Sequence, residues 1–139
     1  MNIEAISAMV NQQTDSMCAE AGQMSLGELE ARLLACPPDL TVVFSDDNQH
    51  PGELMSYRGY YRFIAVSRSD EPCTVRQFYE RVRDAIGQTF TGYKGGDFKM
   101  TRFTPVWVAN YGECPGDGIA GVVQRDGRVV LQVARIEMD

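Results

Sequence analysis

The chain has a single histidine and no closely spaced pair of cysteines, and both absences narrow its possible chemistry. His50 lies in the polar stretch 46–51, where an imidazole is usually solvated. The four cysteines are far apart and form no C-x-x-C pair: Cys18, Cys36, Cys73 and Cys114. One histidine and four scattered cysteines are too few groups for a zinc site, or for a Ser/His or Cys/His catalytic pair. We therefore expect reduced thiols, no metal and no cofactor.

Long apolar runs and targeting signals are also lacking. No run approaches the roughly 18 residues of a membrane-spanning helix. The first residues, Met1-Asn2-Ile3-Glu4, show neither the basic region nor the apolar stretch of a signal peptide. We expect a cytoplasmic protein that does not enter a membrane.

The overall composition is that of one soluble globular domain. The chain has 139 residues, of which 44% are hydrophobic and 23% charged, and this length suffices for a single core. The formal net charge of −6 argues against binding to duplex nucleic acid, which depends on many contacts from Lys and Arg to phosphates.

Aromatic rings and positive charges are concentrated between Tyr57 and Tyr111. This segment holds 12 of the 13 Phe, Trp and Tyr residues. Its nine cations and five acids give it a charge of +4, whereas the other four cations and 14 acids give the remainder −10. Rings that stack, together with guanidinium and ammonium groups, suit an anionic ligand that carries a flat ring.

Three helices are expected from spacing and capping signals. Residues 2–22 keep helical spacing of apolar side chains and end at Gly22. A capping box at Ser25-x-x-Glu28 begins a second helix, which ends before Pro37-Pro38. Residues 74–87 form the third, whose charged outer face favours a solvated surface over a binding site. That face carries Arg76, Glu80, Arg81, Arg83 and Asp84.

The remaining apolar runs predict strands. We expect strands over 40–44, 55–66, 98–103 and 106–110, followed by a hairpin of 119–124 and 128–136 around Asp126-Gly127. The fold class is then α+β, a mostly antiparallel sheet with two to three helices packed on one face. Residues 23–139 form the ligand-binding domain. Residues 1–22 form a helical extension, for which oligomerisation and packing on its own domain both stay open.

The first candidate ligand-binding segment is Ser56-Tyr57-Arg58-Gly59-Tyr60-Tyr61-Arg62. In a strand, Arg58 and Tyr60 share one face and can offer a guanidinium and a ring together. Gly59 weakens a strand unless something approaches the backbone closely. The same residues also fit a strand with one Tyr face in the core and one Arg face in water, and the sequence leaves both interpretations open.

The second segment is Phe90-Thr91-Gly92-Tyr93-Lys94-Gly95-Gly96-Asp97. Its glycines allow turns whose N–H groups converge on an anion, and Lys94 adds charge. It is not a Walker A loop, because the G-K-[ST] order is absent and a strand-like alternation follows. A hairpin loop would use the same glycines, although it would not call for Tyr-Lys at its centre.

The third segment is Thr104-Pro105-Val106-Trp107-Val108-Ala109-Asn110-Tyr111-Gly112. Alternation places Trp107 on the opposite face from its two valine neighbours, and a lone tryptophan is more often core than ligand platform. Asn110 and Tyr111 follow the strand, where recognition groups tend to collect.

These motifs, in this order, resemble a family of small bacteriophage proteins over about residues 25 to 125. The matching stretches are Ser-Tyr-Arg-Gly-Tyr-Tyr at 56–61, Thr-Val at 74–75, Gly-Tyr-Lys-Gly-Gly at 92–96 and Val-Trp-Val-Ala-Asn-Tyr-Gly at 106–112. The architecture is similar to phage anti-defence sponges of the Thoeris anti-defence type. Those proteins bind cyclic ADP-ribose isomers, and some bind cyclic oligonucleotides, without cleaving them, in pockets shared between subunits.

The resemblance implies a non-catalytic homo-oligomer in the host cell cytoplasm that sequesters a nucleotide immune signal. It implies these ligand-binding residues: Tyr57, Arg58, Gly59, Tyr60, Tyr93, Lys94, Gly95, Gly96, Lys99, Arg102, Asn110 and Tyr111. Two alternatives stay open. One is a hydrolase of such a signal with Asp97 or Glu113 as general base, and the other is an acidic protein–protein inhibitor of a host defence factor.

Overall fold

A computed structural model describes residues 22–56, 64–91, 97–109 and 116–136 of the chain. Its helices are α2 (Leu26–Leu34) and α3 (Val75–Ala85). Its strands are β1 (Thr41–Phe44), β2 (His50–Ser56), β3 (Ile64–Ser69), β4 (Thr89–Thr91), β5 (Asp97–Lys99), β6 (Val106–Val108), β7 (Asp117–Arg125) and β8 (Arg128–Arg135). Residues 2–21 of the helix expected over 2–22 lie outside the described residues.

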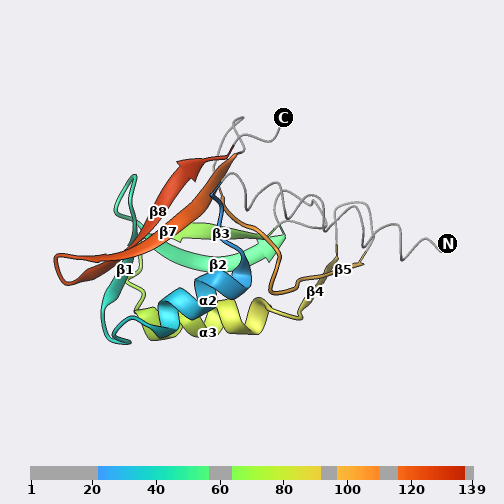
Figure 1. Cartoon of the computed structure of the whole chain (residues 1–139), viewed down its shortest axis with the longest axis horizontal. Coiled ribbons are helices and arrows are strands. Elements are labelled where there is room, and N and C mark those ends of the chain that lie inside the picture. The colour runs from blue at the N-terminus through green and yellow to red at the C-terminus, as the bar shows by residue number, and fades with distance from the viewer. Residues whose placement is uncertain (1–21, 57–63, 92–96, 110–115, 137–139) are drawn as a thin grey trace.

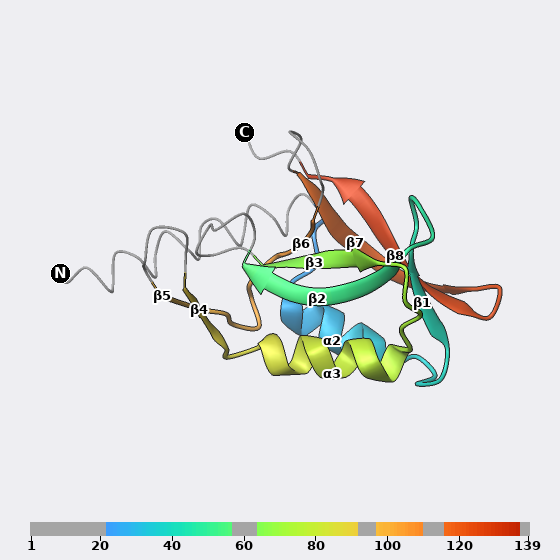
Figure 2. The same cartoon turned by 180° about the vertical axis from the view of Figure 1, so that it is seen from behind.

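Six strands form one sheet in the order β1-β8-β7-β6-β3-β2, while β4 and β5 form a separate hairpin. The sheet curls until its two edge strands, β1 and β2, contact each other, which makes it nearly a barrel (Figure 1). Both helices lie side by side on the same side of the sheet (Figure 2). The α+β class is confirmed.

The expectation of a mostly antiparallel sheet was wrong, because the sheet is mixed. β1 pairs in parallel with β8, and β3 pairs in parallel with β6. The other neighbours, β2–β3, β6–β7 and β7–β8, are antiparallel. The parallel pairs join strands that are far apart in the chain, so no turn signal between them could have revealed their direction.

The helices begin where their capping boxes predict. In α2 the Ser25 hydroxyl accepts the Glu28 amide at 3.3 Å, and the Glu28 carboxylate accepts the Ser25 amide at 3.2 Å. Thr74 and Gln77 repeat this arrangement at α3, and Gly87 follows that helix with φ +87°. Only glycine adopts this backbone conformation without strain, which is why the helix stops there.

The main core lies between the helices and the sheet. The inward faces of α2 and α3 supply Leu26, Leu29, Leu33, Val75, Phe78, Val82 and Ala85, all buried. Alternate residues of the strands meet them: Val42, Phe44, Ile64, Val66, Val106, Val108, Ile119, Val129 and Leu131. No helix among the described residues is long and apolar enough to cross a membrane.

Two strand predictions need correction. The single strand expected over 55–66 is instead the end of β2 and the start of β3, which pair through Ser56 and Ile64 around a segment outside the described residues. The strand expected over 98–103 ends at Lys99, and Thr101–Thr104 form a turn closed by the Thr104 hydroxyl, which accepts the Thr101 amide at 2.9 Å.

His50 is also not a solvated loop residue. It is the first residue of β2, half-buried, and its Nδ1 lies 2.9 Å from the carbonyl oxygen of Val42 in β1. This contact joins the two edge strands of the curled sheet, which gives the histidine a structural role.

Candidate functional site

Ten of the twelve predicted ligand-binding residues lie outside the described residues. They are Tyr57, Arg58, Gly59, Tyr60, Tyr93, Lys94, Gly95, Gly96, Asn110 and Tyr111. Their segments can be located by the strands to which they are attached. Lys99 and Arg102 are described, and both side chains are exposed.

Arg102 already has a protein partner. Its guanidinium lies 2.9 Å from the carboxylate of Glu30 on α2, with 59% of the arginine side chain exposed. Its backbone lies against α2 as well, since its carbonyl oxygen accepts the amide of Gly27 at 2.8 Å. Exposed ion pairs of this kind contribute about 0.2–1 kcal/mol, so a bound anion could compete for Arg102 at small cost.

The segments 57–63 and 92–96 are attached to neighbouring hairpins. Ser56 pairs with Ile64 at the end of β2–β3, and Thr91 pairs with Asp97 at the end of β4–β5. β2 and β4 contact each other, and both views place the β4–β5 hairpin beyond the end of β2 where β3 begins (Figures 1 and 2). The first and second candidate motifs are therefore attached to two hairpins that contact each other, each of them hydrogen-bonded within itself.

The third segment starts close to the first. Ala109, just before residues 110–115, donates its amide to the carbonyl oxygen of Val66 at 2.9 Å. Val66 lies two strand residues from Ile64, or about 7 Å. All three candidate segments, each of which carries a tyrosine, are thus attached within a small part of the structure.

Trp107 lies on the sheet face opposite the helices, as its alternation predicted. It is 4% exposed and packs with Ala65 and Ile136, next to Ala109. Gln23 lies on the same face, only 3% exposed, and its side-chain amide donates to the Val106 carbonyl oxygen at 2.9 Å.

Gly118 allows this close packing. A Cβ there would lie 2.9 Å from both Gln23 Nε2 and Ile136 Cγ1. Buried side chains cannot yield much at such distances, so only glycine lets Gln23 and Ile136 lie directly on the sheet.

Gly118→Ala should lower the free energy of unfolding by about 1–3 kcal/mol, the usual cost of overpacking a tight interior. Gly121→Ala on the same strand is the matched control, because its Cβ would meet chiefly the end of the exposed Gln132 side chain, which can swing away. Urea unfolding of the two variants measures the difference. Equal stabilities would show that Gln23 and Ile136 do not restrict the space at Gly118.

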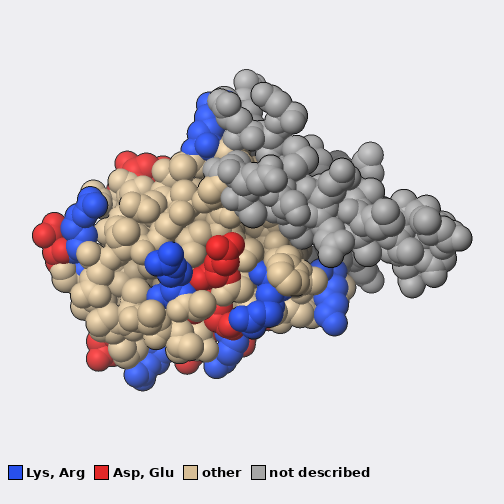
Figure 3. Space-filling model, viewed as in Figure 1, with Lys and Arg blue, Asp and Glu red and all other residues tan. Residues whose placement is uncertain are grey.

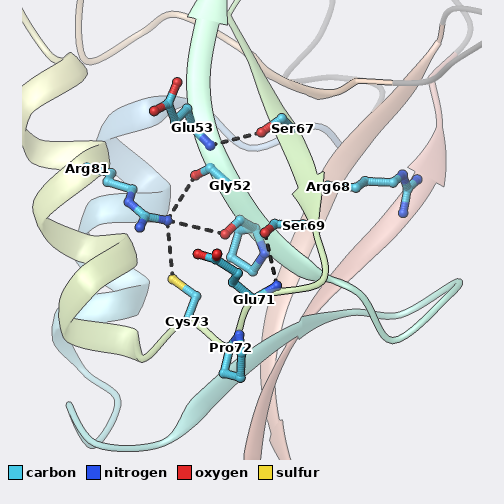
Figure 4. A pocket seen from close by; sticks show the side chains of 10 residues that line it. Gly52, Glu53, Ser67, Arg68, Ser69, Glu71, Pro72, Cys73 and Arg81 are labelled. Atoms are coloured by element: carbon cyan, nitrogen blue, oxygen red, sulfur yellow. Dashed lines mark hydrogen bonds between the residues drawn. The ribbon is translucent and has the colours of Figure 1, made fainter.

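A polar cleft lies between β2, β3 and α3 (Figure 4). Its volume is about 320 Å³. The lining residues are Pro51, Gly52, Glu53, Ser67, Arg68, Ser69, Glu71, Pro72, Cys73 and Arg81. The cleft lies at the end of the β2–β3 hairpin opposite to Ser56 and Ile64.

A β-bulge shapes one wall of this cleft. Pro51 pairs with Arg68 and Leu54 with Val66, so β2 has one extra residue over this interval. Bulges leave ladder groups without their usual strand partner. Here Arg81 donates from Nη1 to the carbonyl oxygens of Pro51 and Gly52 at 3.3 and 3.1 Å.

Cys73 forms part of the cleft next to Arg81. The thiol is 2% exposed, and its sulfur accepts a hydrogen bond from the Arg81 guanidinium at 3.5 Å. Burial raises the pKa of Cys73, while the charge and hydrogen bond of Arg81 lower it in part. The net direction is upward, so the group stays a thiol at neutral pH, as expected for an idle cysteine.

Arg68 faces away from the cleft (Figure 4). Its guanidinium lies 2.9 Å from Asp46 and 2.7 Å from Asp47, and it packs 5.0 Å from the centre of the Phe44 ring. Burial alone would lower the pKa of Arg68, but the two carboxylates outweigh it and raise the pKa. The group therefore joins β3 to the turn after β1.

The charged outer face of α3 is exposed, as predicted, and Figure 3 shows positive and negative side chains intermixed over the helices. Arg81 is exposed too, but one of its guanidinium nitrogens also reaches back to β2, a contact that the sequence did not reveal. Helical spacing places Arg81 on the outer face of α3. No local sequence signal indicates that its long side chain returns to a neighbouring strand. Within the described ranges, no three His, Cys, Asp or Glu side chains are grouped to hold a metal ion.

Comparisons with protein-family models, with curated proteins and with solved structures gave no significant match for this chain.

Proposed function

We propose that this chain is a phage anti-defence protein that binds a nucleotide immune signal of the host and sequesters it without cleavage. The signal would be a cyclic ADP-ribose isomer or a cyclic oligonucleotide. The main support is the attachment of the three motif segments to neighbouring strand ends, two of them to the ends of hairpins in contact.

The chemistry of these segments suits such a ligand. Segment 57–63 carries Tyr and Arg, segment 92–96 carries Tyr93 and Lys94, and segment 110–115 begins with Asn110 and Tyr111. Rings stack on bases at about 1–3 kcal/mol per base, and charged donors bind phosphate oxygens. β3 and β6, to which two of these segments are attached, are fixed by the main core, which would help to hold their groups in place and reduce the entropy lost on binding.

Sequestration needs tight binding and slow release. Nanomolar affinity corresponds to about −12 kcal/mol, which several stacked rings and charge-assisted hydrogen bonds can supply together. Binding of this kind uses no nucleophile and no metal.

Recovery of the bound ligand tests this function. Purified protein is incubated with a cyclic ADP-ribose isomer, separated from free ligand, denatured, and analysed by liquid chromatography and mass spectrometry. A sequestering protein returns the nucleotide intact and in a fixed ratio to the subunits. A linear or cleaved product would identify a hydrolase instead. The acidic inhibitor would be favoured by two results together. The protein would bind no cyclic nucleotide, and it would capture a protein from host lysate that high salt releases.

We also propose that the protein assembles into a homo-oligomer through its N-terminal extension. Residues Ile3, Ile6, Met9, Val10 and Met17 have helical spacing, and an apolar stripe of this length is stable only when it is covered.

Deleting residues 1–22 should reduce either the size of the assembly or its affinity for the nucleotide. Multi-angle light scattering on the full-length and shortened chains measures size, and calorimetry measures affinity. Two monomers of equal affinity would refute both the assembly and a pocket shared between subunits.

A further inference from the structure

The cleft between β2, β3 and α3 is separate from the segments proposed to bind a nucleotide. Segment 57–63 lies between Ser56 and Ile64 at one end of the β2–β3 hairpin, whereas the cleft includes the first residues of β2 and the last residues of β3 at the other end. Its volume of about 320 Å³ lies at the lower end of the range of small-molecule sites.

Two sides of the cleft offer hydrogen-bond donors, β3 through Ser67 and Ser69 and α3 through Arg81 (Figure 4). The Ser67 hydroxyl oxygen accepts the Glu53 amide at 2.9 Å, and the Ser69 hydroxyl oxygen accepts the Glu71 amide at 3.1 Å. Because each oxygen acts as an acceptor, its hydrogen remains able to donate. Arg81 engages the protein through Nη1 alone among the described contacts, so its Nε and Nη2 hydrogens also remain.

The wall opposite Arg81 carries a negative charge. The Glu71 carboxylate points into the cleft across from the Arg81 guanidinium (Figure 4). The two groups form no ion pair within 4.0 Å in the described part of the chain; its ion pairs are made by Arg68, Arg83 and Arg102. Glu53 adds a second exposed carboxylate at the rim.

Repair of the β-bulge explains only part of this arrangement. It accounts for Nη1 of Arg81 and for the oxygen of Ser67, which satisfy backbone groups of β2. It leaves the Glu71 carboxylate and the remaining guanidinium hydrogens facing the same space with opposite charges. A ligand that carries both charges would satisfy both sides, whereas a simple anion or cation would satisfy one and meet repulsion from the other.

We propose that this cleft binds a small zwitterion of the α-amino acid class. The carboxylate of the ligand lies on the remaining guanidinium hydrogens of Arg81, and its ammonium group lies on Glu71. Both contacts are charge-assisted hydrogen bonds, which are the stronger kind. The binding needs no covalent step and no cofactor.

Calorimetry on the full-length protein with three simple probes tests the zwitterion. L-alanine carries both charged groups, ethylamine lacks the carboxylate, and propionate lacks the ammonium group. We expect one L-alanine bound per chain at millimolar concentration or below, with each single-charge analogue at least about tenfold weaker, the usual effect of losing one charged hydrogen bond. Equal binding of L-alanine and either analogue, or no binding of L-alanine, L-serine or L-glutamate, would overturn the proposal.

Glu71→Gln then tests the assigned residue. This exposed side chain keeps its size but loses its charge, so L-alanine should bind at least about tenfold more weakly. Glu80→Gln is the matched control, because Glu80 is an exposed carboxylate of α3 that does not line this cleft. Equal affinity of wild type and Glu71→Gln, or an equal loss in Glu80→Gln, would show that Glu71 does not hold an ammonium group there.

Discussion

Arg58→Ala should abolish binding of the nucleotide while leaving the melting temperature nearly unchanged. Arg58 lies beside Gly59 among tyrosines, where a guanidinium can grip a phosphate through two parallel hydrogen bonds. Removing one partner of a buried, charge-assisted contact costs about 2–5 kcal/mol, or roughly 30-fold or more in affinity. Calorimetry with the cyclic nucleotide that the wild type binds measures the loss.

Arg76→Ala is the control for this variant. Arg76 is also an arginine of the basic segment, but it is exposed on α3, so its loss should change affinity little. An unaltered affinity in Arg58→Ala would remove that residue from the site. Equal losses in both variants would indicate diffuse attraction to a positive surface, which salt would weaken equally.

Phe78→Ala should destabilise the domain severely. The ring is fully buried in the core between α3 and the sheet, and truncation of such a side chain costs about 3–5 kcal/mol because the cavity closes only partly. Domains of this size have about 5–15 kcal/mol in total, so a large share of the stability is lost. Thermal unfolding should show a decrease in the melting temperature of about 10 °C or more.

Arg76→Ala serves as the control here too, since it lies on the same helix with its side chain in solvent. We expect its effect to stay within about 0.5 kcal/mol. If Phe78→Ala were as stable as this control, the packing of α3 on the sheet would not be what holds the domain together.

The elements that the sequence predicted well are those whose signals are local. Both capping boxes, the stop at Gly87 and the Asp126-Gly127 turn act within a few residues. Asp126 and Gly127 have φ of 54° and 76°, as the predicted type I′ turn requires. Each of these devices fixes its element without help from the rest of the chain.

The sequence did not predict which strands pair in parallel, because these strands are far apart in the chain. The parallel pairs β1–β8 and β3–β6 join strands that are separated in the chain by several other elements. The alternation of side chains along one strand carries no information on the direction of its neighbour. The stretch from Met55 to Val66 is rich in Tyr, Phe, Ile and Val throughout, so the sequence did not reveal the end of one strand and the start of the next.

The candidate sites differ in the same way. Composition and motif order identified the segments proposed for nucleotide binding, because rings and cations are visible in a sequence. The polar cleft could not be found, because it depends on a bulge between Pro51 and Leu54 and on a helix residue, Arg81, that contacts it across the fold. Only Pro51-Gly52 before an apolar run gave a weak local signal of irregular backbone.

Mass spectrometry of the small molecules released by heating the protein most directly tests sequestration. The protein is purified from cells that produce the immune signal, heated, and cleared of precipitate, and the supernatant is analysed beside that of Arg58→Ala. The proposed function predicts an intact cyclic ADP-ribose isomer or cyclic oligonucleotide from the wild type and little or none from the variant. A supernatant without nucleotide, or equal amounts from both proteins, would contradict it.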